Sequence, residues 1–527
     1  MAHDVIIKNG IIFDGTGAIP VRADLAIDNG KVNDVGNYKN DNAAVVIDAS
    51  NLYIMPGFID ITNHSDTHWT IFSQPKQESL LRQGITTIIG GHGGVSLAPF
   101  LNSEMLDGLN RWVDTSEINI NWQTVKEFLE SAQKIKIPLN FGTFVGHETL
   151  RASILKGEVR AASKKELSEM LNLLDNALKE GAFGLTTNLG IPQGQAASDE
   201  EIKSLFAMTA RHKLLTSHHL ENEGKNMLPS ISRLINFLRT SGAKGHIAHL
   251  KAIGRSAWES FPNALNMIEL ASKEGVTLSC DFFPYTRTGS NLMSLLPSWA
   301  LAEKKEIIMG LLNDEESKRH ILEYLETLTL HYDRITIASA SRDFSIVGKT
   351  INKISEDSGL SCGEVVLKLL ETNELRVSIF NEVISPENIK DLAKKPYSMI
   401  STDGVGYEIE KIQNQKDMPH PRSFGSFPKV FDWLVKEEGI LTWESAVRKM
   451  TSLPAETLGI KDRGVLRKGY WADVVVIDPQ KIKGESDYNN PFKYADGTQY
   501  VFVNGSLVLA ENKLAENYGG TILKSND

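Results

Sequence analysis

The stretch "GFIDITNHSDTHW", residues 57–69, points most directly to the fold of this chain. Its first half is apolar and begins in a Pro-Gly turn, and its second half carries His64, Asp66 and His68, all side chains that bind metals in proteins. A short buried strand that ends in such side chains is typical of parallel β/α barrels, where functional residues gather at the carboxyl ends of the strands.

The rest of the chain repeats this pattern seven times. Further short apolar runs occupy residues 85–91, 139–147, 182–189, 214–219, 244–249, 276–284 and 397–403. Most of the gaps contain amphipathic helical stretches such as "SKKELSEMLNLLDNALKEG" (163–181). Eight strands with helical crossovers predict an α/β protein with a TIM (β/α)8 barrel over residues 56–457. The gap after the seventh run is too long for one crossover, so we expect an inserted, largely helical, lid-like subdomain at about residues 287–395.

Both ends of the chain have a sequence pattern that differs from that of the central part. Alternating apolar residues broken by Asn-Gly or Asp-Gly occur in "DVIIKNGIIFDG" (4–15), "ADLAIDNGKVNDVG" (23–36) and "QYVFVNGSLVLAENK" (499–513). These dipeptides supply the positive φ angles that β-hairpins need. We expect residues 1–55 and 458–527 to form one small composite β-sandwich; two unrelated β segments are the alternative.

Composition narrows the functional classes. The 527 residues carry a net charge of −10 and no long basic run, which argues against nucleic acids and anionic membranes as partners. Only Cys280 and Cys362 are present, so neither a disulfide framework nor a cysteine-based metal clip is expected. The first residues do not read as a signal peptide, and no apolar run has transmembrane length. A cytoplasmic enzyme is the expectation, and a homo-oligomer is compatible with it.

Metal-binding and acidic residues occupy the predicted strand ends. They are His64, His92, His147, His219, His249, Asp281 and Asp403. Five of the 13 histidines fall at these positions, which favours a metal site over ordinary loop histidines. Of the neighbours His218 and His219, only one can face the barrel axis, because successive strand residues alternate in direction. Imidazoles from two strands and a carboxylate from the last suit Zn²⁺ with an open water position, and Asp403 is placed to take a proton from that water.

Several blocks carry a family resemblance. They include "LRQGITTIIGGHGGVSLAP" (81–99), "HHLENEG" (218–224), "HIAHLKAIGRS" (246–256) and "HPRSFGSFPKV" (420–430). Through these blocks the chain resembles the N-acyl-D-amino-acid deacylase (D-aminoacylase) family of the metal-dependent amidohydrolase superfamily. The resemblance implies a TIM barrel beside a small β-sandwich made from both chain ends. It also implies zinc-dependent hydrolysis of N-acyl-D-amino acids, small-molecule substrates, to a carboxylate and a free D-amino acid.

The resemblance also implies roles for individual residues. His219 and His249 match two histidines of the tightly bound zinc, and Asp403 matches the proton-shuttling aspartate. Lys251, Tyr285 and Arg422 fall where the family binds the α-carboxylate of the substrate, a role that suits the guanidinium fork of Arg422. His147, at the end of the third strand, is a further candidate for substrate binding.

Two ligand positions of the family are altered in this chain. Thr62 stands where the first-strand His-x-His pair has a histidine, and Gly93, preceded by His92, stands where the family has a bridging cysteine. Three hypotheses follow. One zinc is held by His219 and His249 with help from His92; or His64, Asp66 and His68 form another ligand set; or the protein binds no metal and is a binding or assembly protein.

We favour the first hypothesis and expect one zinc ion, an empty second metal position and His64 as a helper. A different amidohydrolase reaction, on cyclic amides or dipeptides, is the alternative within enzymes. The bridging lysine typical of those groups has no counterpart after "AFGLTTNLG" (182–190).

Overall fold

The computed structural model of the chain describes residues 3–109, 118–414, 417–516 and 518–527. Strands from the two ends of the chain form one nine-stranded sheet, in the order β21-β20-β19-β18-β5-β1-β2-β3 with β4 beside β1. The strands are β1 (His3–Ile12), β2 (Val21–Asp28), β3 (Lys31–Gly36), β4 (Ala43–Asp48), β5 (Tyr53–Pro56), β18 (Val474–Ile477), β19 (Thr498–Val503), β20 (Ser506–Ala510) and β21 (Lys513–Leu514). The antiparallel pair β5–β18 joins the N-terminal strands to the C-terminal ones.

The Asn-Gly dipeptides do not all make hairpins. Asn29 (φ 52°) lies in the turn between β2 and β3, and Asn504 (φ 50°) lies in the turn between β19 and β20, both in the left-handed region that these turns require. Asn9 also has a positive φ of 66°, but it lies inside β1, where the register with β2 shifts between Ile7 and Gly10. The expected turn there is therefore wrong: β1 continues through a bulge, an arrangement that also places a positive φ inside a strand.

Eight parallel segments follow the predicted apolar runs. β6 (Phe58–Asp60), β7 (Ile85–Gly90) and β8 (Asn140–Thr143) form a three-stranded sheet. A six-stranded sheet contains β9 (Val145–Gly146), β10 (Gly184–Asn188), β11 (Leu215–His219), β12 (Lys244–Ile247), β13 (Leu278–Phe282) and β17 (Ser398–Ile400). The third run thus supplies both β8 and β9, on either side of Phe144. Beyond the strand ends, Asn63 and Gly404 make a parallel bridge that connects the first and last segments.

Amphipathic helices separate these strands. They are α4 (Val125–Ile135), α5 (His147–Leu155), α6 (Lys164–Lys179), α8 (Asp199–Arg211), α9 (Met227–Ser241), α11 (Phe261–Lys273) and α17 (Pro386–Ala393). Helix α6 illustrates the sequence logic: it begins at a capping box in which Ser163 and Glu166 bond to each other's backbone, and it buries Met170, Leu174 and Leu178. After β17 follow α19 (Arg422–Lys429), α20 (Trp443–Met450) and α21 (Ser452–Leu458).

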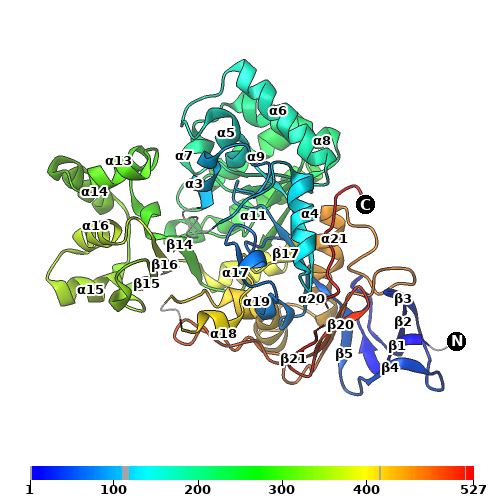
Figure 1. Cartoon of the computed structure of the whole chain (residues 1–527). Helices are drawn as coiled ribbons and strands as arrows, with labels where there is room; N and C mark the ends of the chain where they lie inside the picture. Colours follow the sequence, from blue (N-terminus) through cyan, green and yellow to red (C-terminus); the bar gives the residue numbers. More distant parts are fainter. Residues whose placement is uncertain (1–2, 110–117, 415–416, 517) are drawn as a thin grey trace.

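The insertion is rich in helices, but it also contains a small sheet that we did not expect. It contains α13 (Lys305–Leu311), α14 (Glu315–Thr327), α15 (Ile351–Ser358) and α16 (Cys362–Thr372), but also an antiparallel sheet of β14 (Arg287–Asn291), β16 (Val377–Glu382) and β15 (Ile335–Ala340). Its helices and sheet share a separate hydrophobic core that includes Leu325, Val366 and Ile379. Helix α17 contacts α11 and β17 instead. Figure 1 shows this lobe projecting from one side of the molecule, with the strands β1–β5 on the opposite side.

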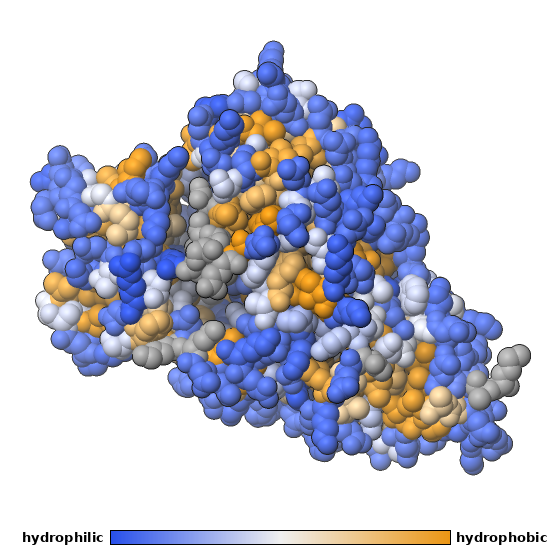
Figure 2. Space-filling view, in the orientation of Figure 1, coloured by the Kyte–Doolittle hydropathy of each residue, from blue (hydrophilic) through white to orange (hydrophobic). Residues whose placement is uncertain are grey.

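The visible face of the molecule is covered mainly by hydrophilic residues, with hydrophobic residues in scattered groups (Figure 2). The largest apolar core lies between the parallel strands and their helices and includes Phe58, Ile88, Leu185 and Ile247. Among the helices that the structure describes, none has both the length and the apolar character required to cross a membrane.

Candidate metal centre and active site

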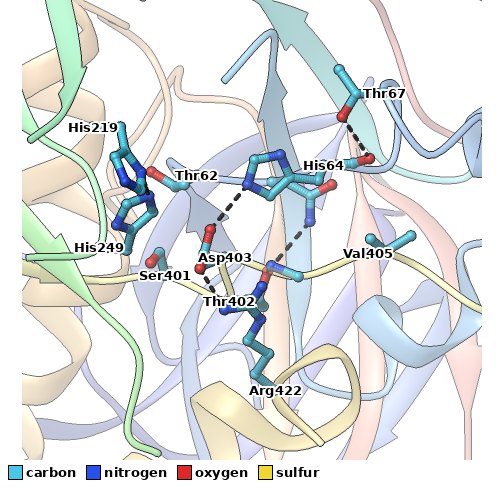
Figure 3. Close-up of polar contacts among 12 residues, drawn as sticks. Thr62, His64, Thr67, His219, His249, Ser401, Thr402, Asp403, Val405 and Arg422 are labelled. Carbon is cyan, nitrogen blue, oxygen red and sulfur yellow. Dashed lines mark hydrogen bonds and ion pairs between the residues drawn. The ribbon is translucent and has the colours of Figure 1, made fainter. Parts of the chain in front are cut away.

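His219 and His249 lie side by side at the ends of neighbouring strands (Figure 3). His219 is the last residue of β11, and its Nδ1 is 2.9 Å from Nε2 of His249, two residues beyond β12. The adjacent His218 turns the other way, with its Nδ1 2.8 Å from the hydroxyl of Thr187. The alternation of strand residues thus places His219 beside His249 and turns His218 away from it.

Glu223 completes this pair, a residue that the sequence analysis did not select. Its Oε2 lies 3.8 Å from Nε2 of His219, and its Oε1 lies 3.4 Å from Nδ1 of His249. Lys251 donates hydrogen bonds from Nζ to Oε1 of Glu223 (2.6 Å) and to Nδ1 of His249 (2.8 Å). Burial alone would raise the pKa of Glu223, but the charge of Lys251 and then that of His219 lower it to about 2. Glu223 is therefore an anion at neutral pH.

His219, Glu223 and His249 form the one group of potential metal ligands found in the described part of the chain, with one ligand atom from each within 4.8 Å of the others. Burial lowers the pKa of His219 to about 3, so its imidazole is neutral at pH 7, the form that binds metals. Two histidines and a glutamate are a known ligand set for zinc with an open fourth position. The donor types therefore fit a zinc ion.

His92 has an unusual environment for a buried histidine. It is 3% exposed, and neither ring nitrogen has a hydrogen-bond partner of ordinary geometry among the described residues. Its ring packs edge-on against those of Phe144 (5.2 Å between centroids) and His64 (6.1 Å). Buried polar groups normally have partners, so an imidazole in this state has capacity for a ligand that the protein itself does not supply.

Asp403 lies between His64 and Arg422. Its Oδ1 is 3.0 Å from Nε2 of His64, and its Oδ2 accepts a hydrogen bond of 2.5 Å from Nη1 of Arg422 (Figure 3). The backbone of Asp403 has a φ of 45°, a left-handed conformation that is uncommon outside glycine and asparagine and recurs at functional sites. Burial alone would raise the pKa of Asp403, but the guanidinium of Arg422 keeps it well below the ordinary value. Asp403 is therefore a carboxylate.

The other candidates for substrate binding differ in position. Lys251 lies within the His249–Glu223 group, as described above. The hydroxyl of Tyr285 donates to the carbonyl of Pro421 (3.2 Å), the residue before Arg422. His147 is 2.7 Å from Glu201 in a buried cluster with Arg151, and its described contacts connect it to none of the other site residues. We therefore assign His147 to a structural cluster with Glu201 and Arg151.

The alternative ligand set in "HSDTH" is not assembled as a metal site. The rings of His64 and His68 are 6.3 Å apart between centroids, and Oδ2 of Asp66 accepts a hydrogen bond from the backbone N–H of Gly91 (2.7 Å). Asp66 and His68 therefore serve the packing of this loop rather than a common ligand position.

The two altered positions have different surroundings. Thr62 is fully buried, and its hydroxyl donates to Oδ2 of Asp281 at 2.6 Å. Gly93 has a φ of 67°, and a Cβ added to it would meet no atom within 4 Å. Thr62 has thus become part of a hydrogen-bond network, while the space beside Gly93 is open.

Known proteins resemble this chain over nearly its whole length. The sequence model of the Amidohydrolase family matches residues 416–509. The D-aminoacylase of Alcaligenes xylosoxydans xylosoxydans is 26% identical over 521 residues, covering 99% of this chain and 97% of the relative. The N-acyl-D-aspartate deacylase of the same organism is 27% identical over 526 residues, covering 99% and 95%.

A solved structure is also similar to this chain over nearly its whole length. The N-acyl-D-glutamate deacylase of Bordetella bronchiseptica, complexed with zinc and a phosphonate inhibitor, aligns with a TM-score of 0.85 at 27% identity. The alignment covers 99% of this chain and all of that one. These similarities show an α/β amidohydrolase fold.

Proposed function

The chain is a homologue of the D-aminoacylases and N-acyl-D-amino-acid deacylases, and we propose that it hydrolyses N-acyl-D-amino acids to a carboxylate and a free D-amino acid with the help of zinc. The observation that carries this proposal is the His219–Glu223–His249 group. Figure 3 shows His219 and His249 on the same side of the parallel strands as Asp403. Neither a lone metal group nor a lone buried carboxylate would specify amide hydrolysis; the homology supplies the substrate class.

We propose that one zinc ion is held by His219, Glu223 and His249. His92 is a further candidate ligand because neither of its ring nitrogens makes a hydrogen bond of ordinary geometry to the described residues. When bound, zinc polarises the amide carbonyl and makes a water molecule more acidic. The hydroxyl of Thr62 donates a hydrogen bond to Asp281, and Gly93 has no side chain, so neither residue would contribute a ligand to a second metal position.

Asp403 is the proposed general base. As a carboxylate it can take the proton of the attacking water and pass it to the leaving amine, which a C–N cleavage requires. His64 and Arg422 hold its two oxygens and so fix its direction. Lys251 and Arg422 are the cations proposed to bind the α-carboxylate of the substrate. If the α-carboxylate takes over Arg422, Asp403 loses a positive partner and becomes a stronger base.

We also propose that the two parallel sheets are parts of one (β/α)8 barrel over residues 56–457. The short break between β8 and β9 and the parallel bridge between Asn63 and Gly404 support a closed barrel. Residues 1–55 and 458–527 would form a small β-sandwich beside it, and residues 287–395 would be an insertion whose lobe has a separate core.

Removal of a proposed ligand tests this function. His219→Ala should lose bound zinc, measured by mass spectrometry of the metal content, and should lose hydrolysis of N-acetyl-D-amino acids. His320→Ala, at an exposed histidine of α14, is the matched control and should keep both. A His219→Ala protein with full zinc content and full turnover would refute the assignment.

A further inference from the structure

Asp281, in β13, is a fully buried carboxylate outside the proposed ligand set. Its Oδ1 accepts hydrogen bonds from the backbone N–H of His249 (2.9 Å) and the hydroxyl of Ser401 (2.5 Å). Its Oδ2 accepts one from the hydroxyl of Thr62 (2.6 Å) and lies 2.7 Å from Nε2 of His246. A carboxylate has about four acceptor positions, so Asp281 is fully occupied by protein groups.

These partners come from three other strands or their ends. Thr62 follows β6, His246 lies in β12, His249 follows β12 and Ser401 follows β17. From the seventh parallel segment, Asp281 therefore makes hydrogen bonds to the first, sixth and eighth segments, including one to the backbone of the proposed ligand His249. Its charge is compensated in place: burial alone would raise the pKa of Asp281, but the hydrogen bond and charge of His246 hold it below the ordinary value.

The contact with His249 has a specific structural effect. His249 has a φ of 42°, in the left-handed region that a β-sheet ladder does not stabilise for histidine. Two hydrogen bonds fix the chain at this point: the N–H of His249 donates to the Asp281 side chain, and the N–H of Leu250 donates to the Asp281 carbonyl at 2.8 Å. With the backbone held in this way, the imidazole of His249 meets that of His219, with ring centroids 4.5 Å apart.

We infer that Asp281 is a positioning residue for the zinc ligand His249, and that Thr62 and Ser401 act with it by filling the remaining acceptor positions of its carboxylate. This inference rests on the proposed zinc-dependent function. It gives Thr62 a positive role: the threonine supports the metal group through its hydrogen bond to Asp281 instead of binding an ion.

The test uses the full-length protein loaded with Co²⁺, whose visible absorption reports the geometry of its ligands. Asp281→Asn keeps the shape of the side chain but removes the charge and one acceptor. We expect it to weaken metal binding about 10- to 100-fold, as changes to groups that orient ligands commonly do, and to alter the Co²⁺ spectrum. Affinity is measured by competition with a chelator.

Asp60→Asn is the control for a change in another buried acidic side chain. Asp60 is equally buried, but its described hydrogen bonds go to Asn63 and Thr402 and not to His249. It should keep the wild-type metal affinity within about twofold and the wild-type spectrum. Equal losses of metal affinity in both variants would indicate general core damage and overturn the inference.

A second pair of variants keeps the test decisive if Asp281→Asn does not fold. Thr62→Val retains the shape and deletes one donor to Asp281, and should weaken metal binding about fivefold. Thr62→Ser retains the donor and should restore wild-type affinity.

Identical affinities in Thr62→Val and wild type would overturn the cooperation of Thr62 with Asp281. If the wild type binds Co²⁺ and Asp281→Asn has the same affinity and spectrum, the inference is overturned but the proposed function is not. If the wild type binds no metal, the proposed function is overturned as well.

Discussion

Asp60 offers a test of how the turn that carries Asp403 is held in place. Its Oδ1 accepts the backbone N–H of Thr402 (2.9 Å), and its Oδ2 accepts the hydroxyl of Thr402 (2.5 Å) and the amide of Asn63 (2.9 Å). Thr402 immediately precedes Asp403, whose left-handed backbone needs such support. The perturbation is Asp60→Asn, which keeps the side-chain shape but cannot ionise.

The size of the expected change in the free energy of unfolding follows from the environment of Asp60. Complete burial raises its pKa from 3.8 to about 7, against the opposing effect of its hydrogen bonds with Thr402. The folded protein therefore keeps a proton on Asp60 at pH values where the unfolded chain has lost it. Since the unfolded state binds fewer protons in this window, stability falls as pH rises from about 4 to about 7. Between pH 5 and pH 8 this single group should lower the free energy of unfolding by about 3 kcal/mol.

The assay compares wild type and Asp60→Asn by urea unfolding at pH 5 and pH 8. The wild type should lose about 3 kcal/mol more than the variant over this interval, because all other titrating groups are common to both. Infrared spectroscopy provides a direct check: at pH 5 the carbonyl band of protonated carboxylic acids should be stronger in the wild type than in the variant. Asp66, another buried acid whose pKa is raised, to about 6, contributes equally to both proteins. Parallel stability curves, or an identical infrared band in both proteins, would refute the reasoning.

Three further variants test the site itself. Asp403→Asn should keep its zinc while kcat falls about 100-fold or more, because a general base is lost; a kcat within threefold of wild type would remove Asp403 from the mechanism. Glu223→Gln should raise the Kd for zinc about 100-fold in a chelator competition, and an unchanged Kd would exclude Glu223 as a ligand. Arg422→Lys should raise KM for N-acyl-D-amino acids about tenfold, because lysine cannot bind a carboxylate bidentately; an unchanged KM would exclude its contact with the α-carboxylate.

The positions of the strands were predictable because buried parallel strands are short, continuous apolar runs. Each of the eight runs contains a strand. Alternation of side chains predicted that only one of His218 and His219 faces the site, and the family resemblance favoured His219. The insertion was harder, since "VSIFNE" in β16 is an isolated alternating segment between strongly helical stretches. The bulge at Asn9 was not predicted because a hairpin turn and a bulge can both require a residue with positive φ, and the sequence pattern is the same for both.

Glu223 could not be identified from the sequence. It lies in the polar loop "ENEG" after β11, where a glutamate is usually solvated, and only the fold brings it to Lys251 and His249. Lys251, two residues from a metal-binding histidine, was the one available signal for a buried acidic partner. His147 illustrates the opposite difficulty: a histidine at a strand end resembles a site residue in the sequence, and only the fold shows its buried contact with Glu201.

Thr62 shows what the three-dimensional arrangement adds to a substitution. From the sequence it is a position that has lost a metal-binding side chain. In the fold its hydroxyl donates to Asp281, whose carboxylate also accepts the backbone N–H of His249. The altered residue and the proposed zinc ligand are therefore connected through one buried carboxylate.

The most direct test of the central claim is the rate of hydrolysis of matched N-acetyl-D- and N-acetyl-L-amino acids by the purified protein. The rates are measured as isolated, after removal of metal by a chelator, and after addition of zinc. The account predicts release of acetate from D-substrates alone, loss of this activity with the metal and its return with zinc. Hydrolysis that is indifferent to the chelator, equal rates on both enantiomers, or no hydrolysis of any D-substrate by the zinc-loaded protein would contradict it.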